Sequence, residues 1–371
     1  MKFSTDRKTL AEVLSQIQGL TDRKTDFSIT SDVLISASGS EITITANNLE
    51  TVFQGKYQAE IESDGIISIN AKKIYEITKE YPDSKILLNE IENRWVEIGE
   101  GNVQYHIVSS DYNNFIETPL IENVSFIDVQ ASFFKKMINI SSIINFSRDE
   151  KRPYVLGVLI EKISIKNKNY LRMVSTDSKR ITCIDVEYKG EFKADNQDII
   201  IPKKCLSELS NIFRKEGDIK IGVKNDHLIV KRENETIMVK LLAAKYPGYQ
   251  YIIDTEDKIP IEMDRNMFLS MMRRMSILTS DDYKSVIFSF KENKLIVTIT
   301  NPEIGESKEE IDISYKGDFI ETAFNPFYFI DALKVIENDT IVLYIKDNKN
   351  PCIIKDIYDD KLICAVMPIF I

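Results

Sequence analysis

The sequence is poor in the residue types from which most enzyme active sites are built. Its 371 residues include only two histidines, four cysteines, one tryptophan, 13 glycines and ten prolines. No nucleophile elbow, phosphate-binding Gly-Lys-Ser/Thr loop, dinucleotide-binding glycine-rich turn or His-Glu-x-x-His pair occurs. The residues therefore indicate no catalytic site, and we expect no metal and no cofactor.

The few histidines and cysteines are also scattered. His106 and His227 each lie in a strand-like stretch, and we expect both to be structural or surface residues. Paired carboxylates such as Asp281-Asp282 are typical of solvated turns. None of the cysteines is spaced as a metal-binding or redox pair, so we expect four small buried hydrophobic residues: Cys183, Cys205, Cys352 and Cys364.

Long apolar runs are absent. No stretch approaches the roughly 20 residues of a membrane span, and the N-terminus has no apolar core of signal-peptide length. We therefore expect a cytoplasmic protein that does not bind membranes. Glycine and proline are too few for a long flexible linker, and the 43% hydrophobic content is that of a folded chain.

A repeat organises the chain. The pentapeptide Tyr188-Lys-Gly-Glu-Phe192 returns as Tyr315-Lys-Gly-Asp-Phe319, and both copies follow a strand-like run and precede a helical pattern. A period of this length indicates repeated domains rather than a solenoid. We predict three domains, 1–122, 123–255 and 256–371.

The three copies are predicted to share one α+β plan. Each has two helices, backed on one face by about eight antiparallel strands. An acidic residue introduces each first helix, namely Asp6, Asp128 and Asp264, and Pro202 and Pro326 are predicted to occupy the first helical position of two others. The predicted helical windows are 5–20, 70–80, 130–145, 202–216, 264–278 and 325–338.

Charge is divided unevenly between helices and strands. The net charge is −10, yet the six helical windows hold 15 basic and nine acidic residues. The rest of the chain holds 33 basic and 49 acidic residues. Helices facing the same way would present a positive surface on a negative body, which suits a polyanion bound through its phosphates without sequence reading. Lysines on solvated helix faces are the plain alternative.

Two other functional classes remain open from the residues alone. An acidic repeat scaffold that binds only proteins would form no ring and would not be retained on circular DNA. An enzyme with an unrecognised site at a domain junction is the other possibility, and the lack of clustered His, Cys or glycine-rich loops counts against it.

Several motifs resemble a known family. They are Arg152-Pro-Tyr-Val-Leu-Gly157, Val174-Ser-Thr-Asp-Ser-Lys-Arg-Ile181 and the C-terminal Val366-Met-Pro-Ile369. Together with the repeat, they are similar to the bacterial sliding clamp, the beta subunit of DNA polymerase III, along the whole chain. The resemblance implies a head-to-tail homodimer in which six domains close a ring around double-stranded DNA, bound without sequence preference. It implies a nucleoid-associated processivity factor for DNA replication with no catalysis of its own.

The resemblance also implies three sets of site residues. The DNA-facing set is Arg23, Lys24, Lys72, Lys73, Arg152, Tyr154, Lys203 and Lys204. The set that joins the two copies of the ring is Lys73, Tyr105, Ile277 and Leu278. A pocket for short hydrophobic peptides would be lined by Val155, Thr176, Ser178, Lys179, Arg180, Ile181, Pro247, Tyr251, Ile252, Pro351, Val366, Met367, Pro368 and Ile369.

The implied partners of that pocket are the replicative polymerase alpha subunit, the clamp loader delta subunit and other replication and repair proteins. The sequence departs from the family at its rim. Ser178 and Lys179 stand where Gly-His is common, and Tyr251 stands where an arginine is frequent. We therefore expect a peptide preference of its own. Val155 and Ile181, both in strand-like stretches, also fit a plain core role.

Overall fold

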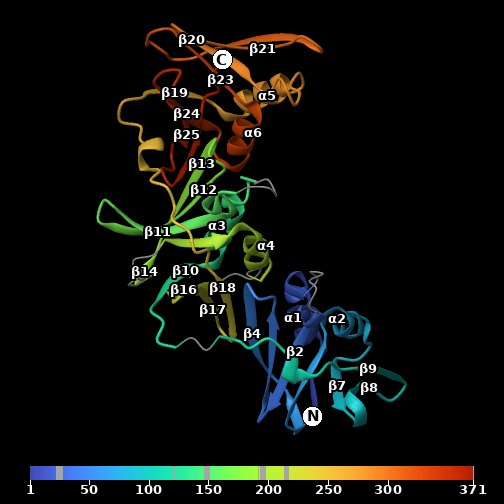
Figure 1. Cartoon of the computed structure of the whole chain (residues 1–371). Helices are drawn as coiled ribbons and strands as arrows, with labels where there is room; N and C mark the ends of the chain where they lie inside the picture. The colour runs from blue at the N-terminus through green and yellow to red at the C-terminus, as the bar shows by residue number, and fades with distance from the viewer. Residues whose placement is uncertain are drawn as a thin grey trace. The chain divides into compact units, whose positions relative to one another are not determined.

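The computed structural model describes residues 1–21, 28–119, 122–145, 151–190, 192, 198–212 and 217–370. In this part of the chain, two helices and a set of antiparallel strands occur three times in succession (Figure 1). The chain therefore consists of three repeated α+β domains, as the sequence predicts. No described helix is long and apolar enough to cross a membrane.

The first repeat begins with strand β1 and contains helices α1 and α2. Its elements are β1 (Lys2–Asp6), α1 (Arg7–Thr21), η1 (Ser28–Ser31), β2 (Asp32–Ser38), β3 (Glu41–Asn47), β4 (Thr51–Gln58), β5 (Glu60–Ser63), β6 (Gly65–Asn70), α2 (Ala71–Glu80), β7 (Lys85–Glu90), η2 (Glu92–Arg94), β8 (Trp95–Glu100), β9 (Val103–Val108) and η3 (Tyr112–Asn114).

The second repeat contains helices α3 and α4. Its elements are β10 (Phe126–Gln130), α3 (Ala131–Ser141), η4 (Pro153–Leu156), β11 (Gly157–Ile165), β12 (Lys168–Thr176), β13 (Arg180–Glu187), β14 (Lys189–Gly190), β15 (Ile199–Pro202), α4 (Lys203–Ile212), β16 (Asp218–Lys224), β17 (His227–Arg232), β18 (Glu235–Lys240) and η5 (Gln250–Ile252).

The third repeat contains helices α5 and α6. Its elements are β19 (Ile259–Asp264), α5 (Arg265–Ser276), β20 (Val286–Lys291), β21 (Lys294–Asn301), β22 (Gly305–Asp312), β23 (Ile320–Phe324), α6 (Pro326–Val335), β24 (Thr340–Ile345), β25 (Cys352–Asp356) and β26 (Leu362–Val366).

Side-chain caps explain where several helices start. The Asp6 carboxylate accepts a hydrogen bond from the Thr9 backbone N–H at 2.7 Å, and Asp264 caps Met267 in the same way at 2.6 Å. Asn70 and Asn325 cap α2 and α6. Each cap satisfies a backbone donor that the first helical turn leaves without an intrahelical partner.

Two predicted helix starts were wrong. Asp128 lies inside strand β10, and α3 begins three residues later at Ala131. Pro202 ends strand β15, so that α4 begins at Lys203, whereas Pro326 does occupy the first helical position of α6. Both misplaced residues belong to strands that run directly into a helix, and propensity alone does not locate such a boundary.

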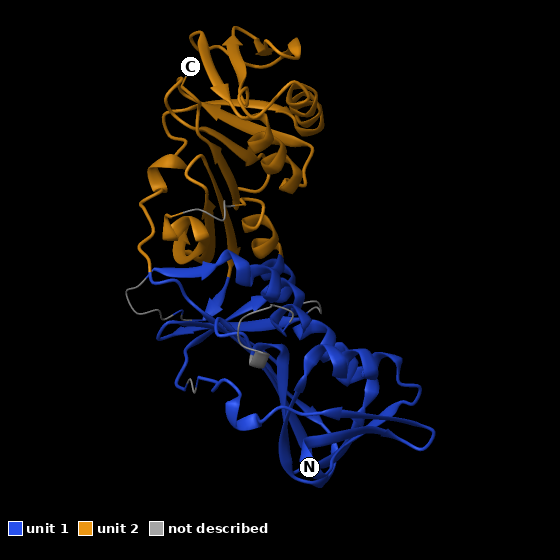
Figure 2. Cartoon of the chain, turned by 45° about the vertical axis from the view of Figure 1, so that its right-hand side comes forward, with its two compact units in different colours: residues 1–135, 188–243 blue, residues 136–187, 244–371 orange. Residues whose placement is uncertain are grey.

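The described chain divides into two compact units, residues 1–135 with 188–243 and residues 136–187 with 244–371 (Figure 2). The division falls inside the second repeat, so the units do not coincide with the repeats. The reason lies in the sheets, because each unit contains a sheet whose strands come from two successive repeats.

In the first unit, a nine-stranded sheet runs in the order β14-β10-β16-β17-β18-β4-β3-β2-β6. Its two repeats meet where β18 pairs antiparallel with β4, with Met238 opposite Val52. A second sheet, β5-β1-β7-β8-β9, has β9 at its edge. Helix α1 packs against both α2 and α4, and buries Leu10, Leu14 and Ile17 at helical spacing.

In the second unit, the larger sheet runs in the order β11-β12-β13-β26-β25-β24-β19. Its two repeats meet where β13 pairs antiparallel with β26, with Thr182 opposite Cys364. The smaller sheet, β22-β21-β20-β23, has β22 at its edge. Helices α5 and α6 pack together.

Aromatic side chains form the core beneath α5 and α6. Phe268, Phe288, Phe324 and Phe329 are fully buried, and the ring centroids of Phe288 lie 5.2 Å from those of both Phe324 and Phe329. Burying one phenylalanine stabilises a fold by roughly 1.5–3 kcal/mol. The same clustering fixes helix α6, which carries Phe329, against the sheet.

The two pentapeptides that reveal the repeat are packed differently. Tyr188 and Tyr315 are both buried. Phe192 is buried, with its ring centroid 6.4 Å from that of Tyr188, whereas 59% of Phe319 is exposed. The two pentapeptides therefore occupy equivalent positions in their repeats, but the side chains of Phe192 and Phe319 have different surroundings.

The scattered histidines and cysteines lie where the sequence predicts. His106 is in β9 and His227 is in β17, which confirms their placement in strands. All four cysteines are buried and free. Among the described residues, no group of three or more His, Cys, Asp or Glu side chains could hold a metal ion.

Candidate functional site

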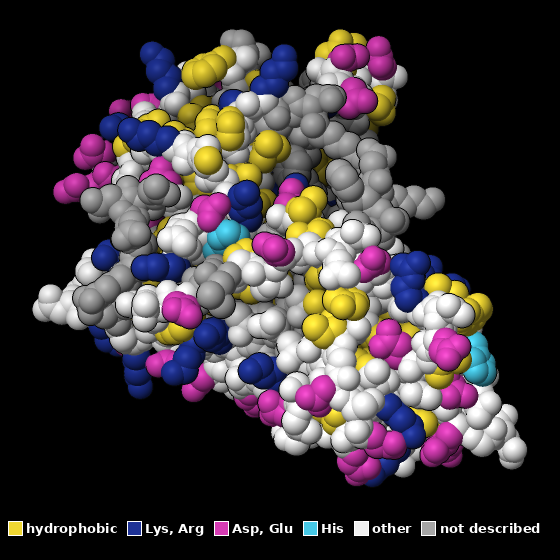
Figure 3. Space-filling view, turned by 60° about the horizontal axis from the view of Figure 1, so that its bottom comes forward, with side chains coloured by type: hydrophobic (Ala, Val, Ile, Leu, Met, Phe, Trp, Pro, Cys, Tyr) yellow, Lys and Arg dark blue, Asp and Glu magenta, His cyan; other side chains and the backbone are white. Residues whose placement is uncertain are grey.

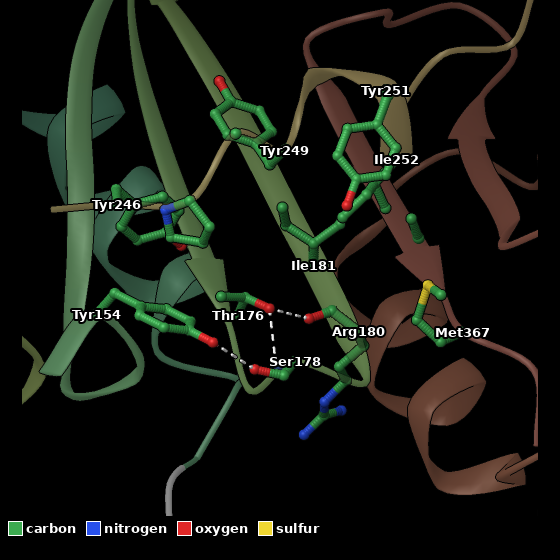
Figure 4. A pocket seen from close by; sticks show the side chains of 13 residues that line it. Tyr154, Thr176, Ser178, Arg180, Ile181, Tyr246, Tyr249, Tyr251, Ile252 and Met367 are labelled. Carbon is green, nitrogen blue, oxygen red and sulfur yellow. Dashed lines mark hydrogen bonds between the residues drawn. The ribbon is translucent and has the colours of Figure 1, made fainter. Parts of the chain in front are cut away.

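A cavity of about 240 Å³ lies in the second unit, where the second and third repeats meet (Figure 4). Its walls come from η4, the end of β12, the turn into β13, the bend before η5, η5 itself and the end of β26. The lining residues are Tyr154, Thr176, Ser178, Arg180, Ile181, Tyr246, Pro247, Gly248, Tyr249, Tyr251, Ile252, Ala365 and Met367. Most of these side chains are apolar or aromatic, as is typical of small-ligand pockets.

The turn between β12 and β13 is fixed by its own side chains. The Asp177 carboxylate accepts hydrogen bonds from the backbone N–H groups of Lys179 at 2.9 Å and Arg180 at 3.0 Å. The Thr176 hydroxyl accepts from the Ser178 N–H at 3.0 Å and donates to the Arg180 carbonyl at 2.7 Å. Ser178 is held at a φ of 72°, in the left-handed region where glycine is favoured. This network presents the Ser178 side chain to the cavity (Figure 4).

Three tyrosines form one wall of the cavity. The ring of Tyr246 is edge-on to Tyr154, with centroids 6.0 Å apart, and edge-on to Tyr249, with centroids 6.4 Å apart. Each hydroxyl has a partner inside the protein: Tyr154 shares a hydrogen bond with Ser178, Tyr246 donates to the Val174 carbonyl, and Tyr249 donates to Glu161. The wall therefore offers ring surface rather than free hydroxyl groups.

Burial determines the protonation of this wall. It raises the pKa of the Tyr246 hydroxyl far above its ordinary value. Burial, followed by the hydrogen bond to Glu161, does the same for Tyr249. Both side chains stay neutral across the physiological range, so the cavity gains no negative charge from them.

A buried ion pair supports the strand behind this wall. Arg172 donates from Nε and Nη2 to the two carboxylate oxygens of Asp185, each at 2.7 Å, between β12 and β13. Burial opposes the charge on Arg172, but the two hydrogen bonds to Asp185 outweigh it and raise the pKa of the guanidinium. Such a bidentate pair fixes strand geometry as well as charge.

Arg180 is the charged residue of the cavity lining, and its charge is already compensated. Its Nε donates to Asp177 at 3.0 Å and its Nη1 donates to Asp331 of α6 at 2.7 Å. The guanidinium also lies 4.5 Å from the ring centroid of Tyr328. A ligand in the cavity therefore meets a nearly neutral, apolar surface.

The structure brings together eight of the fourteen residues expected to form a peptide pocket. They are Thr176, Ser178, Arg180, Ile181, Pro247, Tyr251, Ile252 and Met367. Ile181 is buried and also lines the cavity, so its two roles are compatible. Tyr251 projects from η5 and is 76% exposed (Figure 4).

Six of the fourteen residues do not line the cavity. Val155 and Val366 are each only 1% exposed and pack in the core. For Val155, the sequence analysis gives this core role as the alternative to a pocket role. Ile369 instead bridges to Ala323 of β23. The remaining three are Lys179, Pro351 and Pro368.

The sequence reading missed several members of the lining. Tyr246, Gly248, Tyr249 and Ala365 were not assigned to the pocket, and Tyr154 was assigned to the DNA-facing set. The sequence predicts a bend at Tyr246-Pro-Gly-Tyr249, but only the packing of the two tyrosine rings shows that the bend lines the cavity. Tyr154 is two residues after Arg152, and its hydroxyl lies 3.2 Å from that of Ser178.

The residues expected to face DNA have mixed environments. Arg23 and Lys24 lie outside the described residues. Lys72 and Lys73 are exposed on α2, and the Lys73 ammonium lies 3.1 Å from Glu76. Arg152 is exposed just before η4.

The remaining two DNA-facing candidates begin helix α4. Lys203 is only 9% exposed, which disfavours a direct phosphate contact. Lys204 is exposed and pairs with Glu50 of the turn between β3 and β4. A phosphate at this place would compete with Glu50 for the Lys204 ammonium.

The helices carry a net positive charge, as the sequence predicts. They contain 13 basic and five acidic residues, against 48 and 58 in the whole chain. On the face drawn in Figure 3, basic side chains are interspersed with acidic ones rather than gathered in one patch. The excess of positive charge is thus a property of the helix sequences, and it does not form a single basic patch on this face.

Three of the four residues expected to join two copies, Lys73, Tyr105 and Ile277, are exposed. Tyr105, on edge strand β9, is 39% exposed, and Ile277, after α5, is 73% exposed. Leu278 is half-buried beside it. Exposed apolar side chains beside the edge strands β9 and β22 are suited to burial against another chain.

Family models match the chain along nearly its whole length. The N-terminal domain of the DNA polymerase III beta subunit matches residues 1–119, its central domain residues 128–248 and its C-terminal domain residues 250–370. Together they account for all three repeats.

Curated relatives and solved structures agree with the family models. The beta sliding clamp of Chlamydia pneumoniae is 29% identical over 96% of both chains, and that of Pseudomonas putida is 24% identical over 99% of both. A solved DNA polymerase III beta subunit from Eubacterium rectale superimposes over the whole of both chains, with a TM-score of 0.89 and 27% identity.

These matches assign all three repeats to one protein family. Clamps of this kind are non-catalytic processivity factors of DNA replication, consistent with a cavity lined by ring surface rather than reactive groups. The chain belongs to the family of the DNA polymerase III beta subunit, the beta sliding clamp.

Proposed function

We propose that two copies of this chain associate head to tail into a closed ring of six domains around double-stranded DNA. The ring tethers replication proteins to DNA and so confers processivity, without catalysis of its own. The domains are residues 1–122, 123–255 and 256–371. A ring that encloses its DNA needs little affinity for it, because topology retains it, and this keeps the protein with the nucleoid.

One observation carries the proposal of a ring. Successive repeats of this chain are joined by antiparallel strand pairing, β4 with β18 and β13 with β26. In each pair, the fourth strand of one repeat meets the last strand of the next. The fourth strand of the third repeat, β22, and the last strand of the first, β9, are sheet edges. A second copy supplies each edge with the partner that it lacks, and a heterologous contact of this kind closes a ring when its rotation permits.

The charge of the helices supports DNA as the contents of the ring. Contacts from lysine and arginine to phosphates are independent of sequence and weaken with salt, which allows sliding. Lys72, Lys73, Arg152 and Lys204 are the exposed candidates among the described residues, and Arg23 and Lys24 lie outside the described residues. Because Lys204 pairs with Glu50 and Lys73 pairs with Glu76, a phosphate would compete with these carboxylates for the two ammonium groups.

The cavity at β12, β13 and β26 supports the tethering role. Its tyrosine wall and Met367 offer an apolar surface for a short hydrophobic peptide, with methionine able to adapt to different side chains. The partners that we propose are the replicative polymerase alpha subunit, the clamp loader delta subunit and other replication and repair proteins that carry such a peptide. A solved sliding clamp from Bartonella birtlesii, 22% identical to this chain, was crystallised with griselimycin bound.

Retention on DNA tests the ring. The protein is loaded onto nicked circular DNA with its clamp loader, isolated, and challenged with salt concentrations that remove phosphate-only binders. We expect retention on the circle and loss once the circle is cut, because a ring runs off free ends. Equal loss from intact and cut circles would contradict encirclement and favour a scaffold that binds only proteins.

Peptide binding tests the tethering role separately. A fluorescent peptide of the Gln-Leu-x-Leu-Phe type is titrated against the full chain, a Met367→Ala variant and a chain that ends at Val366. We expect micromolar binding that both changes weaken or abolish, because Met367 lines the cavity. The point variant is needed because the truncation also removes the Ile369 bridge to Ala323.

A further inference from the structure

One face of strands β11, β12 and β13 carries both a part of the cavity lining and a row of charged side chains. Thr176 lies opposite Ile181, and both line the cavity. Four residues away along β12, Arg172 lies opposite Asp185 on one side and Glu161 on the other. Residues an even number apart share a face of a strand, and four residues span about 13 Å. The charged row therefore lies on the cavity's face of the sheet, but outside its lining.

The carboxylates of this row outnumber its cation. Arg172 uses Nε and Nη2 for the two carboxylate oxygens of Asp185, each at 2.7 Å. Glu161, on the other side of Arg172, brings a second carboxylate. Arg172 and Asp185 are buried, and Glu161 is half-buried. A carboxylate in such surroundings needs a hydrogen-bond donor of its own.

Tyr249 supplies a donor to Glu161. Its hydroxyl donates to Glu161 Oε1, and the side chain is only 2% exposed. Figure 4 shows this hydroxyl pointing away from Thr176 and Ser178. Burial and then the bond to Glu161 raise the pKa of the hydroxyl, so it remains a donor at physiological pH. A single side chain therefore joins the charged row to the wall of the cavity.

Side-chain contacts hold the segment that carries Tyr249. Residues 241–249 belong to no helix or strand. Two tyrosine hydroxyls fasten this segment to the sheet, Tyr246 to the Val174 carbonyl at 3.2 Å and Tyr249 to Glu161. The two rings also pack edge-on, with centroids 6.4 Å apart. The orientation of the Tyr249 ring therefore depends on the contact of its hydroxyl as well as on its neighbour.

We propose that Glu161 is a positioning residue of the peptide pocket, which holds the Tyr249 hydroxyl and thereby keeps the Tyr249 ring in place as a wall of the cavity. The inference rests on the proposed peptide binding and deepens it, because it makes affinity depend on a residue that does not line the cavity. Without this contact the ring gains conformational freedom, and a peptide that binds must order it at a cost in affinity.

A titration of the full chain with the fluorescent Gln-Leu-x-Leu-Phe peptide tests this role. Glu161→Ala and Tyr249→Phe each remove one side of the contact and leave every ring of the wall present. We expect each variant to bind about three- to tenfold more weakly than wild type. The double variant should bind no more weakly than the weaker single variant, because both changes remove the same interaction.

A conservative variant separates the hydrogen bond from the charge. Glu161→Gln keeps an acceptor oxygen for the Tyr249 hydroxyl and should bind within about twofold of wild type. A role of Glu161 in sheet stability alone predicts no coupling between its replacement and Tyr249→Phe in peptide affinity.

The matched control is Glu187→Ala. Glu187 lies on the same face of β13 as Asp185, two residues further from the cavity, and its carboxylate pairs with Lys168 at 3.1 Å. Both partners are exposed, so this variant should bind the peptide like wild type. Urea unfolding shows that each variant is folded. If Glu161→Ala does not fold, Tyr249→Phe and Glu161→Gln carry the test.

Folded Glu161→Ala and Tyr249→Phe variants that bind like wild type would overturn the positioning role and leave peptide binding in place. Additive losses in the double variant, or a Glu161→Gln variant as weak as Glu161→Ala, would also overturn it, because Glu161 would then act by its charge or through another residue. An equal loss in Glu187→Ala would overturn it in favour of a general effect on the sheet. No binding by the wild-type chain would overturn the positioning role together with the proposed tethering.

Discussion

The Arg180 guanidinium donates from Nη1 to the Asp331 carboxylate at 2.7 Å, and so fastens the turn of the second repeat to helix α6 of the third. The same guanidinium lies over the Tyr328 ring. Through this contact, the strand turn that lines the cavity is positioned by a helix from another repeat. Asp331 does not line the cavity, so replacing it should loosen the cavity wall without changing a residue that a peptide would contact directly.

Asp331→Asn should lower the free energy of unfolding by about 1 kcal/mol, because a charge-assisted hydrogen bond becomes a neutral one while Asp177 still pairs with Arg180. It should also weaken peptide binding severalfold. Urea unfolding and a peptide titration measure the two effects. The matched control is Asp339→Asn, whose side chain is 79% exposed, lies 3.8 Å from Arg265 and accepts a hydrogen bond from Asn266 at 3.0 Å. Asparagine keeps an acceptor oxygen there, so the control should change neither quantity. Equal effects of the two variants would contradict this role of Asp331.

Tyr251→Ala should weaken peptide binding about three- to tenfold, while Tyr251→Phe should bind like wild type. The Tyr251 ring lines the cavity, is 76% exposed and has no ring or hydrogen-bond partner among the described residues, so it is free to cover a bound peptide. Fluorescence titration gives the affinity. Tyr358→Ala, at a side chain that is 80% exposed and outside the cavity, is the control.

Replacing the Tyr251 ring by an arginine tests whether charge at this position changes the peptide preference of the pocket. Tyr251→Arg should favour peptides with an acidic residue over neutral ones, and this gain should fall with added salt. The wild-type preference should be nearly independent of salt, because Arg180 is already compensated by Asp177 and Asp331. A strongly salt-dependent affinity in the wild type would show that the pocket carries a charge that its geometry does not account for.

Ile277→Asp should convert the dimer into a monomer at micromolar concentration while leaving the thermal midpoint of the monomer unchanged. The side chain is 73% exposed in the single chain, so the substitution disturbs no core, but it places a charge in the proposed contact between copies. Sedimentation gives the mass, for which a dimer is twice 42.7 kDa. Tyr358→Asp adds the same charge at an 80% exposed site and should stay dimeric.

Asp6→Ala should lower the free energy of unfolding by about 1 kcal/mol at pH 7, because the α1 cap is lost. Hydrogen bonds from the Thr9 hydroxyl and backbone N–H, each at 2.7 Å, lower the pKa of the Asp6 carboxyl below its ordinary 3.8. The charge-dependent part of this stabilisation is therefore present above pH 3.8 and is lost as the pH falls through the lower folded value.

Urea unfolding between pH 2 and 7 measures this dependence. The difference between wild type and Asp6→Ala should shrink towards the acid end. Asp6→Asn keeps a hydrogen-bond acceptor without the charge, so its stability relative to Asp6→Ala should be independent of pH over the same range. A constant difference between wild type and Asp6→Asn would contradict the assigned role of the carboxylate charge.

The lining of the proposed pocket shows which of its residues can be predicted from the sequence. Thr176, Ser178 and Arg180 are close in sequence, so a local motif places them together. Tyr154, Tyr246 and Ala365 come from distant segments, and only the tertiary structure brings them to the same cavity. Val155 and Val366 belong to the motifs that resemble the family, yet both are buried in the core. Val366 ends strand β26, where side chains alternate between the two faces, whereas Val155 lies in η4 rather than in the strand that its sequence suggests.

The amino-acid sequence alone determined the three repeats, the two helices of each, the excess of positive charge in those helices and the burial of the cysteines. Each of these follows from local spacing, capping or residue type. Tertiary structure alone decided which side chains line the cavity, that Lys203 is buried while Lys204 pairs with Glu50, and that β9 and β22 are edges. Those features depend on strand register between segments far apart in the chain, and composition or periodicity does not encode the register.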